Sequence, residues 1–187
     1  AVFNQKLAST VDEDLSFIVP ARALQEVSRL IGTQQEPIEF MVTPSKSQVL
    51  FRLDGVEIVS QLIQGTFPNY SQLIPEGYEA RVMVEQSAFL SATRTASIFA
   101  RDGSGIVKLQ ASVANGASGH LTVSSRAEEL GDNQGIIDAT IEGDNESKIA
   151  FNSKYLAEVL DVLGDGQVAL ETTTPNSPGV LRRVSND

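Results

Sequence analysis

The chain of 187 residues contains no cysteine and no tryptophan, and it has one histidine, His120. Without cysteine it can form no disulfide, no thiolate nucleophile and no zinc site built on thiolates. The motifs GxGxxG, GxxxxGK[ST], HExxH and GxSxG are absent, so the dinucleotide, phosphate, zinc-protease and hydrolase mechanisms that need them lack their minimal residues. We therefore expect no enzyme active site, no metal and no cofactor.

Long apolar runs are also absent. No stretch approaches the roughly 18 uninterrupted apolar residues of a membrane span, and the opening AVFNQKLASTVDEDL lacks the basic and apolar regions of a signal peptide. We expect a cytoplasmic protein with no membrane partner.

Positive charge is scarce, because the chain has 14 Lys and Arg residues but 24 Asp and Glu residues, which gives a net charge of -10. Taken alone, this average argues against a nucleic-acid partner, which needs cations to displace counterions from phosphates. The position of the cations matters more than the average. Four of them fall on predicted helices, where they form either a local positive surface or ordinary solvated helix surface: Arg22, Arg29, Arg94 and Lys154.

Two segments resemble each other, FIVPARALQEVSRLI at 17–31 and IAFNSKYLAEVLDVL at 149–163. Each predicts a short strand, a helix-starting residue (Pro20 or Asn152) and a helix with apolar residues on one face. A strand, a Pro/Ser turn and a second strand follow in both copies, at 38–53 and 167–184. A unit that recurs about 130 residues apart indicates duplicated domains rather than a solenoid.

The segment between the copies predicts a long helix at 84–100 and alternating strands at 105–114 and 119–130. We interpret His120 as a solvated histidine of the Gly-rich turn GASGH, and the acidic residues as surface. The expected fold class is α+β, with repeated domains that each place two helices on one face of antiparallel sheets.

The segment TFPNYSQLIP at 66–75, together with the 149–163 helix and NSPGVLRRV at 176–184, resembles the beta subunits of bacterial DNA polymerase III, the DNA sliding clamps. The resemblance covers essentially the whole chain. It implies that residues 1–75 are the C-terminal part of the middle clamp domain and that 76–187 are the last domain. It further implies that a pocket-forming segment precedes Ala1 and that an apolar tail follows Asp187.

This resemblance implies a ring-shaped homodimer that encircles duplex DNA without sequence specificity. The ring would act as a processivity factor and bind short peptides of the polymerase III catalytic subunit, the clamp loader and other partners. The residues alone leave open a non-catalytic α+β protein-interaction domain unrelated to DNA. The positions that match the family's peptide pocket are Pro68, Gln72, Leu73, Asn152, Tyr155, Ser177 and Pro178. Those that match its DNA-facing lining are the four helix cations above, and those that match its subunit interface are Ile98, Phe99, Glu128 and Glu129.

Overall fold

A computed structural model of the chain describes residues 1–6, 14–101, 104–127, 131–143 and 146–184. The chain divides into two compact units, one of residues 2–69 and one of residues 70–187 together with Ala1. Each unit has its own hydrophobic core.

The smaller unit is one helix on a three-stranded antiparallel sheet. The apolar residues of the helix recur at helical spacing, which places Val27 against the central strand of the sheet. This strand alternates buried and exposed residues, so one of its faces is buried. Val49, Phe51 and Leu53 form that buried face. The elements are α1 (Ala21–Ile31), β1 (Glu39–Val42), β2 (Gln48–Leu53) and β3 (Val56–Gln61), with strand order β1-β2-β3.

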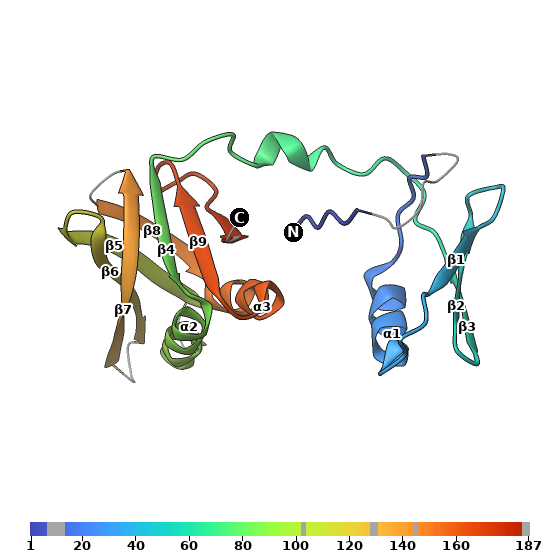
Figure 1. Cartoon of the computed structure of the whole chain (residues 1–187), viewed down its shortest axis with the longest axis horizontal. Coiled ribbons are helices and arrows are strands. Elements are labelled where there is room, and N and C mark those ends of the chain that lie inside the picture. The colour runs from blue at the N-terminus through green and yellow to red at the C-terminus, as the bar shows by residue number, and fades with distance from the viewer. Residues whose placement is uncertain (7–13, 102–103, 128–130, 144–145, 185–187) are drawn as a thin grey trace. The chain divides into compact units, whose positions relative to one another are not determined.

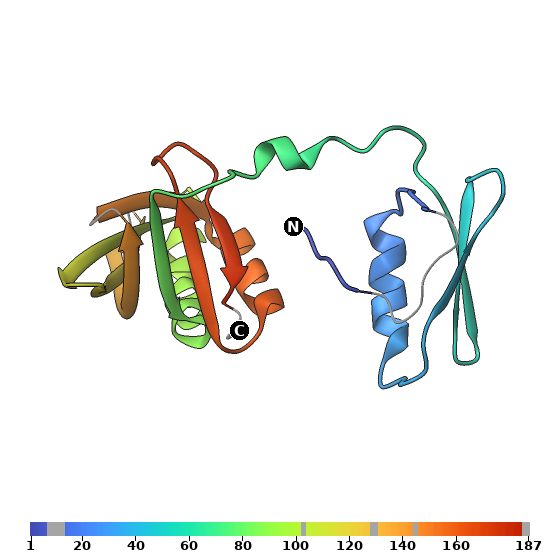
Figure 2. The same cartoon turned by 45° about the horizontal axis from the view of Figure 1, so that its top comes forward.

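The larger unit is a seven-stranded antiparallel sheet with two helices, which lie next to each other in both views (Figures 1 and 2). The strand order is β10-β9-β4-β7-β6-β5-β8. A short 3-10 helix, η1 (Tyr70–Leu73), opens the unit. Its other elements are β4 (Ala80–Glu85), α2 (Gln86–Arg101), β5 (Ile106–Asn115), β6 (Ser118–Ala127), β7 (Gly131–Gly143), β8 (Glu146–Asn152), α3 (Ser153–Leu163), β9 (Gln167–Thr172) and β10 (Val180–Arg183).

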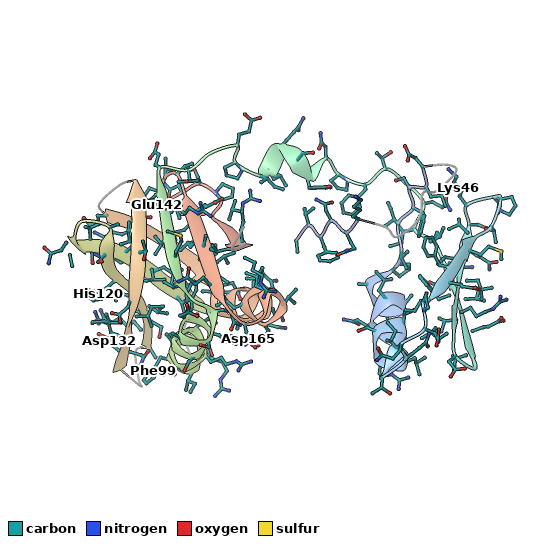
Figure 3. The ribbon with its side chains drawn as sticks, viewed as in Figure 1. Lys46, Phe99, His120, Asp132, Glu142 and Asp165 are labelled. Atoms are coloured by element: carbon teal, nitrogen blue, oxygen red, sulfur yellow. The ribbon has the colours of Figure 1, made fainter. Side chains whose placement is uncertain are left out.

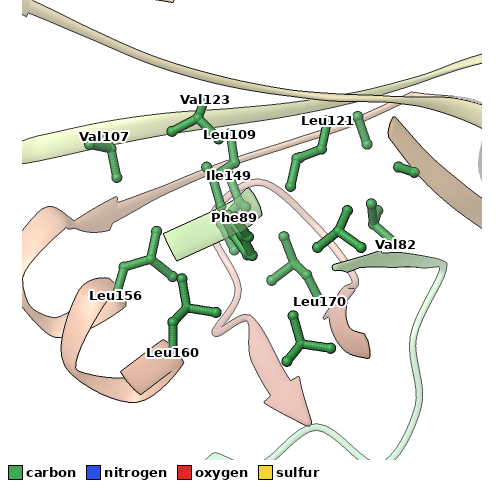
Figure 4. Close-up of a cluster of buried hydrophobic side chains, with 14 of the residues drawn as sticks. Val82, Phe89, Val107, Leu109, Leu121, Val123, Ile149, Leu156, Leu160 and Leu170 are labelled. Carbon is green, nitrogen blue, oxygen red and sulfur yellow. The ribbon is translucent and has the colours of Figure 1, made fainter. Parts of the chain in front are cut away.

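The core of the larger unit lies between its two helices and the sheet. Phe89 of α2 is fully buried, and Leu156 and Leu160 of α3 belong to the same cluster (Figure 4). Leu109 and Leu170 contribute to this cluster from two strands of the sheet. Burial of such side chains contributes roughly 1.5–3 kcal/mol each and fixes the helices on one face of the sheet.

The two repeated helices begin and end in corresponding ways. Pro20 and Asn152 are the N-cap residues of α1 and α3, and both helices have eleven residues. Each ends at a glycine with positive φ, Gly32 at 51° and Gly164 at 69°, a backbone conformation that favours glycine. The start residues predicted from the repeat are confirmed, and so is the predicted face of α3. On α1, Val27 and Ile31 pack in the core as predicted, but Leu24, expected on the same face, is exposed.

The predicted fold class, α+β with helices on antiparallel sheets, is confirmed. Two further expectations need correction. Residues 17–19 form only an isolated bridge, Ile18 with Ile63, rather than a strand. His120 lies within β6 and not in a turn. The preceding glycine, Gly119, is also part of this strand, where a side chain would collide with the carbonyl oxygen of Ser112 on β5. None of the helices in the described ranges is long and apolar enough to cross a membrane.

Candidate functional site

The four cations predicted to face DNA all lie on helices and are exposed. Three of them are ion-paired with acidic residues of the same unit. Arg29 contacts Glu26 at 2.8 Å, Lys154 approaches Glu158 to 3.9 Å, and Arg94 of α2 contacts Asp161 of α3 at 2.9 Å. Within the described ranges, Arg22 has no ion pair. Since these pairs are exposed, each contributes at most about 1 kcal/mol and leaves the cation accessible to a competing anion.

The helices differ in charge from the rest of the chain. On α1, α2 and α3 together the cations outnumber the acids, whereas in the whole chain 24 acids outnumber 14 cations. The helix surfaces are therefore positive on an acidic molecule. The helix cations are Arg22, Arg29, Arg94, Arg101 and Lys154, and the helix acids are Glu26, Glu158 and Asp161.

Asn152 and Tyr155, two predicted pocket residues, are joined at the start of α3. The Asn152 side-chain oxygen accepts hydrogen bonds from the backbone N–H groups of Lys154 at 3.0 Å and Tyr155 at 3.3 Å. This cap satisfies two of the four N–H groups that a helix start leaves without partners. It also fixes the backbone of Tyr155, whose side chain is 68% exposed. A large amphipathic ring held out into solvent is suited to contact a partner.

Ser177 and Pro178, in the turn between β9 and β10, lie near the same helix start. The Ser177 hydroxyl is 2.7 Å from that of Thr174, and its N–H donates to the Thr174 carbonyl at 3.1 Å. The next residue, Gly179, contacts Phe151, the residue before Asn152, so closely that a Cβ at Gly179 would lie 2.7 Å from the Phe151 ring. The structure thus brings four predicted pocket residues to one end of α3.

We expect Gly179→Ala to lower the free energy of unfolding by about 1–3 kcal/mol, since its methyl group would overlap both Phe151 and Ile149. Chemical denaturation followed by circular dichroism measures this. Gly77→Ala is the matched control, because no atom lies within 4 Å of a Cβ there. Equal stability of the two variants would contradict the close contact.

Three more predicted pocket residues lie around the boundary of the units. Pro68 belongs to the unit of residues 2–69, and Gln72 and Leu73 lie on η1 in the unit of residues 70–187. Leu73 is 69% exposed. The grouping of these three residues with the end of α3 stays a prediction.

The predicted subunit-interface pair lies near the end of α2. Ile98 is 57% exposed and Phe99 is half-buried. The Ser125 hydroxyl of β6 donates to the Ala96 carbonyl at 2.7 Å, which holds this part of α2 against the end of β6. Figure 3 shows Phe99 and Asp132 of β7 at the same end of the unit. Glu128 and Glu129 lie outside the described residues.

Among the described residues, β7 has a free edge that sequence reasoning missed. Residues 131–140 of β7 pair with β6 on one side, but on the other side β4 pairs only with residues 140–143. In the part of the chain that the structure describes, residues 131–139 have no strand on that other side. An unpaired edge offers backbone groups to another strand. A polar strand such as GDNQG gives no periodic signal that could have predicted it.

Groups with shifted pKa values give no sign of acid–base catalysis. Hydrogen bonding and attraction from Lys148 lower the pKa of the exposed Glu146 carboxyl, and Glu57 raises that of Arg52. His120 is half-exposed and lies 3.4 Å from the exposed Asp138. No group of three or more potential metal ligands occurs among the described residues. These are ordinary surface ion pairs.

Two helix-on-sheet units with cationic helices define an α+β protein of the sliding-clamp class. Family models of the DNA polymerase III beta subunit match it, the central domain over residues 1–69 and the C-terminal domain over residues 71–187. The chain belongs to the DNA polymerase III beta subunit family, and it covers the central and C-terminal domains.

Relatives and solved structures agree with this assignment. The beta sliding clamp of Bacillus subtilis is 30% identical over 189 residues, which cover 100% of this chain and 48% of that protein. The beta sliding clamp of Staphylococcus aureus is 29% identical over 95% of this chain and 45% of its own length. The crystal structure of the Bacillus subtilis sliding clamp aligns with a TM-score of 0.86 at 31% identity, over 98% of this chain and 47% of that chain. The chain thus spans about half the length of the curated relatives it matches.

Proposed function

We propose that the chain is part of a DNA sliding clamp, a processivity factor without an active site of its own. Its proposed partners are duplex DNA, the DNA polymerase III catalytic subunit, the clamp loader and other proteins with clamp-binding peptides. A second copy would complete the ring in the full-length protein, and the place of action would be the cytoplasm. The domain division we propose follows the sequence, with the middle domain in residues 1–75 and the last domain in 76–187.

The observation that supports DNA as a partner is the charge contrast between the helices and the rest of the chain. The helices have more cations than acids, although the chain as a whole has a net charge of -10. In a ring whose helices face the hole, this distribution would give a mildly positive lining and an acidic exterior. A protein that bound DNA on its outer surface would need its cations on that surface and not on the helices.

The mechanism we propose is topological. A closed ring retains DNA by enclosing it, so strong phosphate contacts would only slow its movement along the duplex. Exposed cations that are already ion-paired, such as Arg29 and Lys154, provide weak attraction that salt screens within about 10 Å. Such a lining keeps DNA centred without holding one register.

The peptide-binding function rests on the end of α3. Asn152, Tyr155, Ser177 and Pro178 combine an exposed aromatic ring, a capped helix start and a turn held by hydrogen bonds. Pro68, Gln72 and Leu73 would add apolar and polar contacts from the segment that joins the two units. Exposed apolar groups beside fixed polar groups are typical of sites that bind short peptides.

The ring contact that we propose uses Ile98, Phe99 and the free edge of β7. The exposed Ile98 would lose its contact with water against the second copy, and Glu128 and Glu129 would supply acidic contacts. The backbone groups of residues 131–139 could pair with a strand of the neighbouring subunit, which would extend the sheet across the contact.

Removal of the helix cations tests whether duplex DNA is a partner. In the complete ring, we expect each single Gln substitution of Arg22, Arg29, Arg94 or Lys154 to reduce the slope of log affinity against log salt by at most about one. We expect Arg22→Gln to have the largest effect of the four, because the other three cations are ion-paired. Fluorescence anisotropy of a labelled duplex over a series of salt concentrations measures the slope.

Arg52→Gln is the control for this experiment, since it removes one cation from the sheet of the smaller unit instead of from a helix. Its slope should equal that of the parent protein. An unchanged slope for the variant with all four helix substitutions would contradict the proposed lining. It would favour the alternative function, a protein-interaction domain unrelated to DNA.

A further inference from the structure

Arg94 and Asp161 form an ion pair that links the two helices of the larger unit. One guanidinium nitrogen of Arg94 donates to both oxygens of the Asp161 carboxylate, at 2.9 and 3.0 Å. The residues are 67 positions apart in the chain, and both side chains are half-exposed. Both also line a hollow of about 460 Å³ at the surface, so solvent ions can reach the pair.

Asp161 has no favourable role within its own helix. It lies in the last turn of α3, where the helix dipole favours a cation, and that turn contains no basic residue. The corresponding ninth residue of α1 is a cation, Arg29, which is the basic residue of that helix's last turn. The second and sixth residues of the two helices have matching charges, Arg22 with Lys154 and Glu26 with Glu158. The charge at position nine is therefore reversed in the last domain, at the place where Arg94 is its partner.

The pair puts Asp161 in competition with DNA for Arg94. A guanidinium binds a carboxylate and a phosphate with the same donors, so Arg94 can satisfy only one of them fully. Because the pair is exposed, it is weak, and a phosphate close to α2 and α3 can exchange with the carboxylate.

We propose that Asp161 weakens the hold of this domain on DNA by occupying Arg94, and that Arg94 becomes a full phosphate ligand when Asp161 is neutralised. This inference rests on the proposed function of the chain as part of a sliding clamp. It assigns to Asp161 a positioning role, which acts through Arg94 and needs no contact with DNA. The result is a lining whose attraction is limited from within the protein.

The test is a double-mutant cycle in the complete ring, with Asp161→Asn, Arg94→Gln and both together. Duplex affinity is measured by anisotropy over a fourfold range of salt. We expect Asp161→Asn to raise the affinity and to steepen the salt slope by about 0.9, which corresponds to about a threefold larger loss of affinity across that range. In the Arg94→Gln background, the same substitution should steepen the slope far less.

Asp165→Asn is the matched control, because Asp165 lines the same hollow without an ion pair to Arg94 within the described residues. It removes an equal charge, and its effect should be smaller and independent of Arg94. Equal effects of Asp161→Asn and Asp165→Asn, or additive effects of Asp161→Asn and Arg94→Gln, would overturn the inference while leaving DNA binding intact. Absence of salt-dependent DNA association from the parent ring and all variants would overturn the proposed function itself.

Thermal unfolding separates this role from a purely structural one. The pair is exposed, so Asp161→Asn and Arg94→Gln should unfold at nearly the same temperature as the parent protein. A large drop for Asp161→Asn, with no gain in DNA affinity, would show that the pair only holds α2 and α3 together and would overturn the inference.

Discussion

Phe89→Ala should remove about 3–5 kcal/mol from the free energy of unfolding of the larger unit, a substantial part of the 5–15 kcal/mol typical of a native domain. Phe89 is 0% exposed and belongs to the cluster that joins α2 and α3 to the sheet (Figure 4). The substitution deletes a whole ring and leaves a cavity, since Leu156 and Leu160 are held by their own helix and cannot fully close it. Denaturant unfolding monitored by far-UV circular dichroism measures the change.

Ile98→Ala is the matched control on the same helix. Its side chain is 57% exposed, so its loss should change the stability by less than about 1 kcal/mol. Ring assembly, measured by analytical ultracentrifugation of the full-length protein, should be weakened by Ile98→Ala if this residue lies in the proposed contact. Similar unfolding midpoints for the two variants would contradict the assignment of Phe89 to the core.

Tyr155→Ala should weaken the binding of polymerase-derived peptides by about 2 kcal/mol or more, which is roughly 30-fold. The Asn152 cap holds the backbone of Tyr155, and its ring is exposed before any partner binds. A tyrosine side chain has only two main rotatable bonds, so it loses little conformational freedom on binding, and such residues often dominate peptide interfaces. Isothermal titration calorimetry in the full-length protein measures the affinity.

Val162→Ala provides the control for this prediction, because Val162 is 84% exposed near the opposite end of α3. Peptide affinity should not change in that variant. Tyr155→Phe adds a second comparison and separates the contribution of the ring from that of the hydroxyl group. If Tyr155→Ala and Val162→Ala bind equally well, the pocket does not include the start of α3.

Local signals made the repeated helices predictable. Pro20 and Asn152 mark the starts, and the apolar spacing of 3.6 residues marks the buried faces. Both signals arise within a dozen residues, so no tertiary contact is needed to interpret them. The hairpins that follow were predictable for the same reason, because their turns contain Pro and Ser between alternating strands.

Other features depend on distant contacts and could not be predicted from local patterns. The Gly-rich segment before His120 favours a turn, whereas the need for glycine at position 119 of β6 comes from the Ser112 carbonyl of β5, which occupies the space of a side chain. The ion pair of Arg94 with Asp161 spans 67 residues, so the sequence could indicate the cation but not its neutralising partner. The residues of the peptide pocket came from family resemblance, since no local pattern joins Tyr155 to Ser177.

The open edge of β7 also limits the ways in which two copies can associate. Asp132 and Asp138 lie near the two ends of the unpaired stretch, on either side of Gly135. If two identical edges paired antiparallel about Gly135, Asp132 of each copy would face Asp138 of the other, and like charges directly opposite each other are destabilising. Two-fold association of this edge in the register centred on Gly135 is therefore disfavoured. Pairing with a different edge avoids the clash of charges and leads to head-to-tail order, in which each subunit presents one kind of surface and receives another.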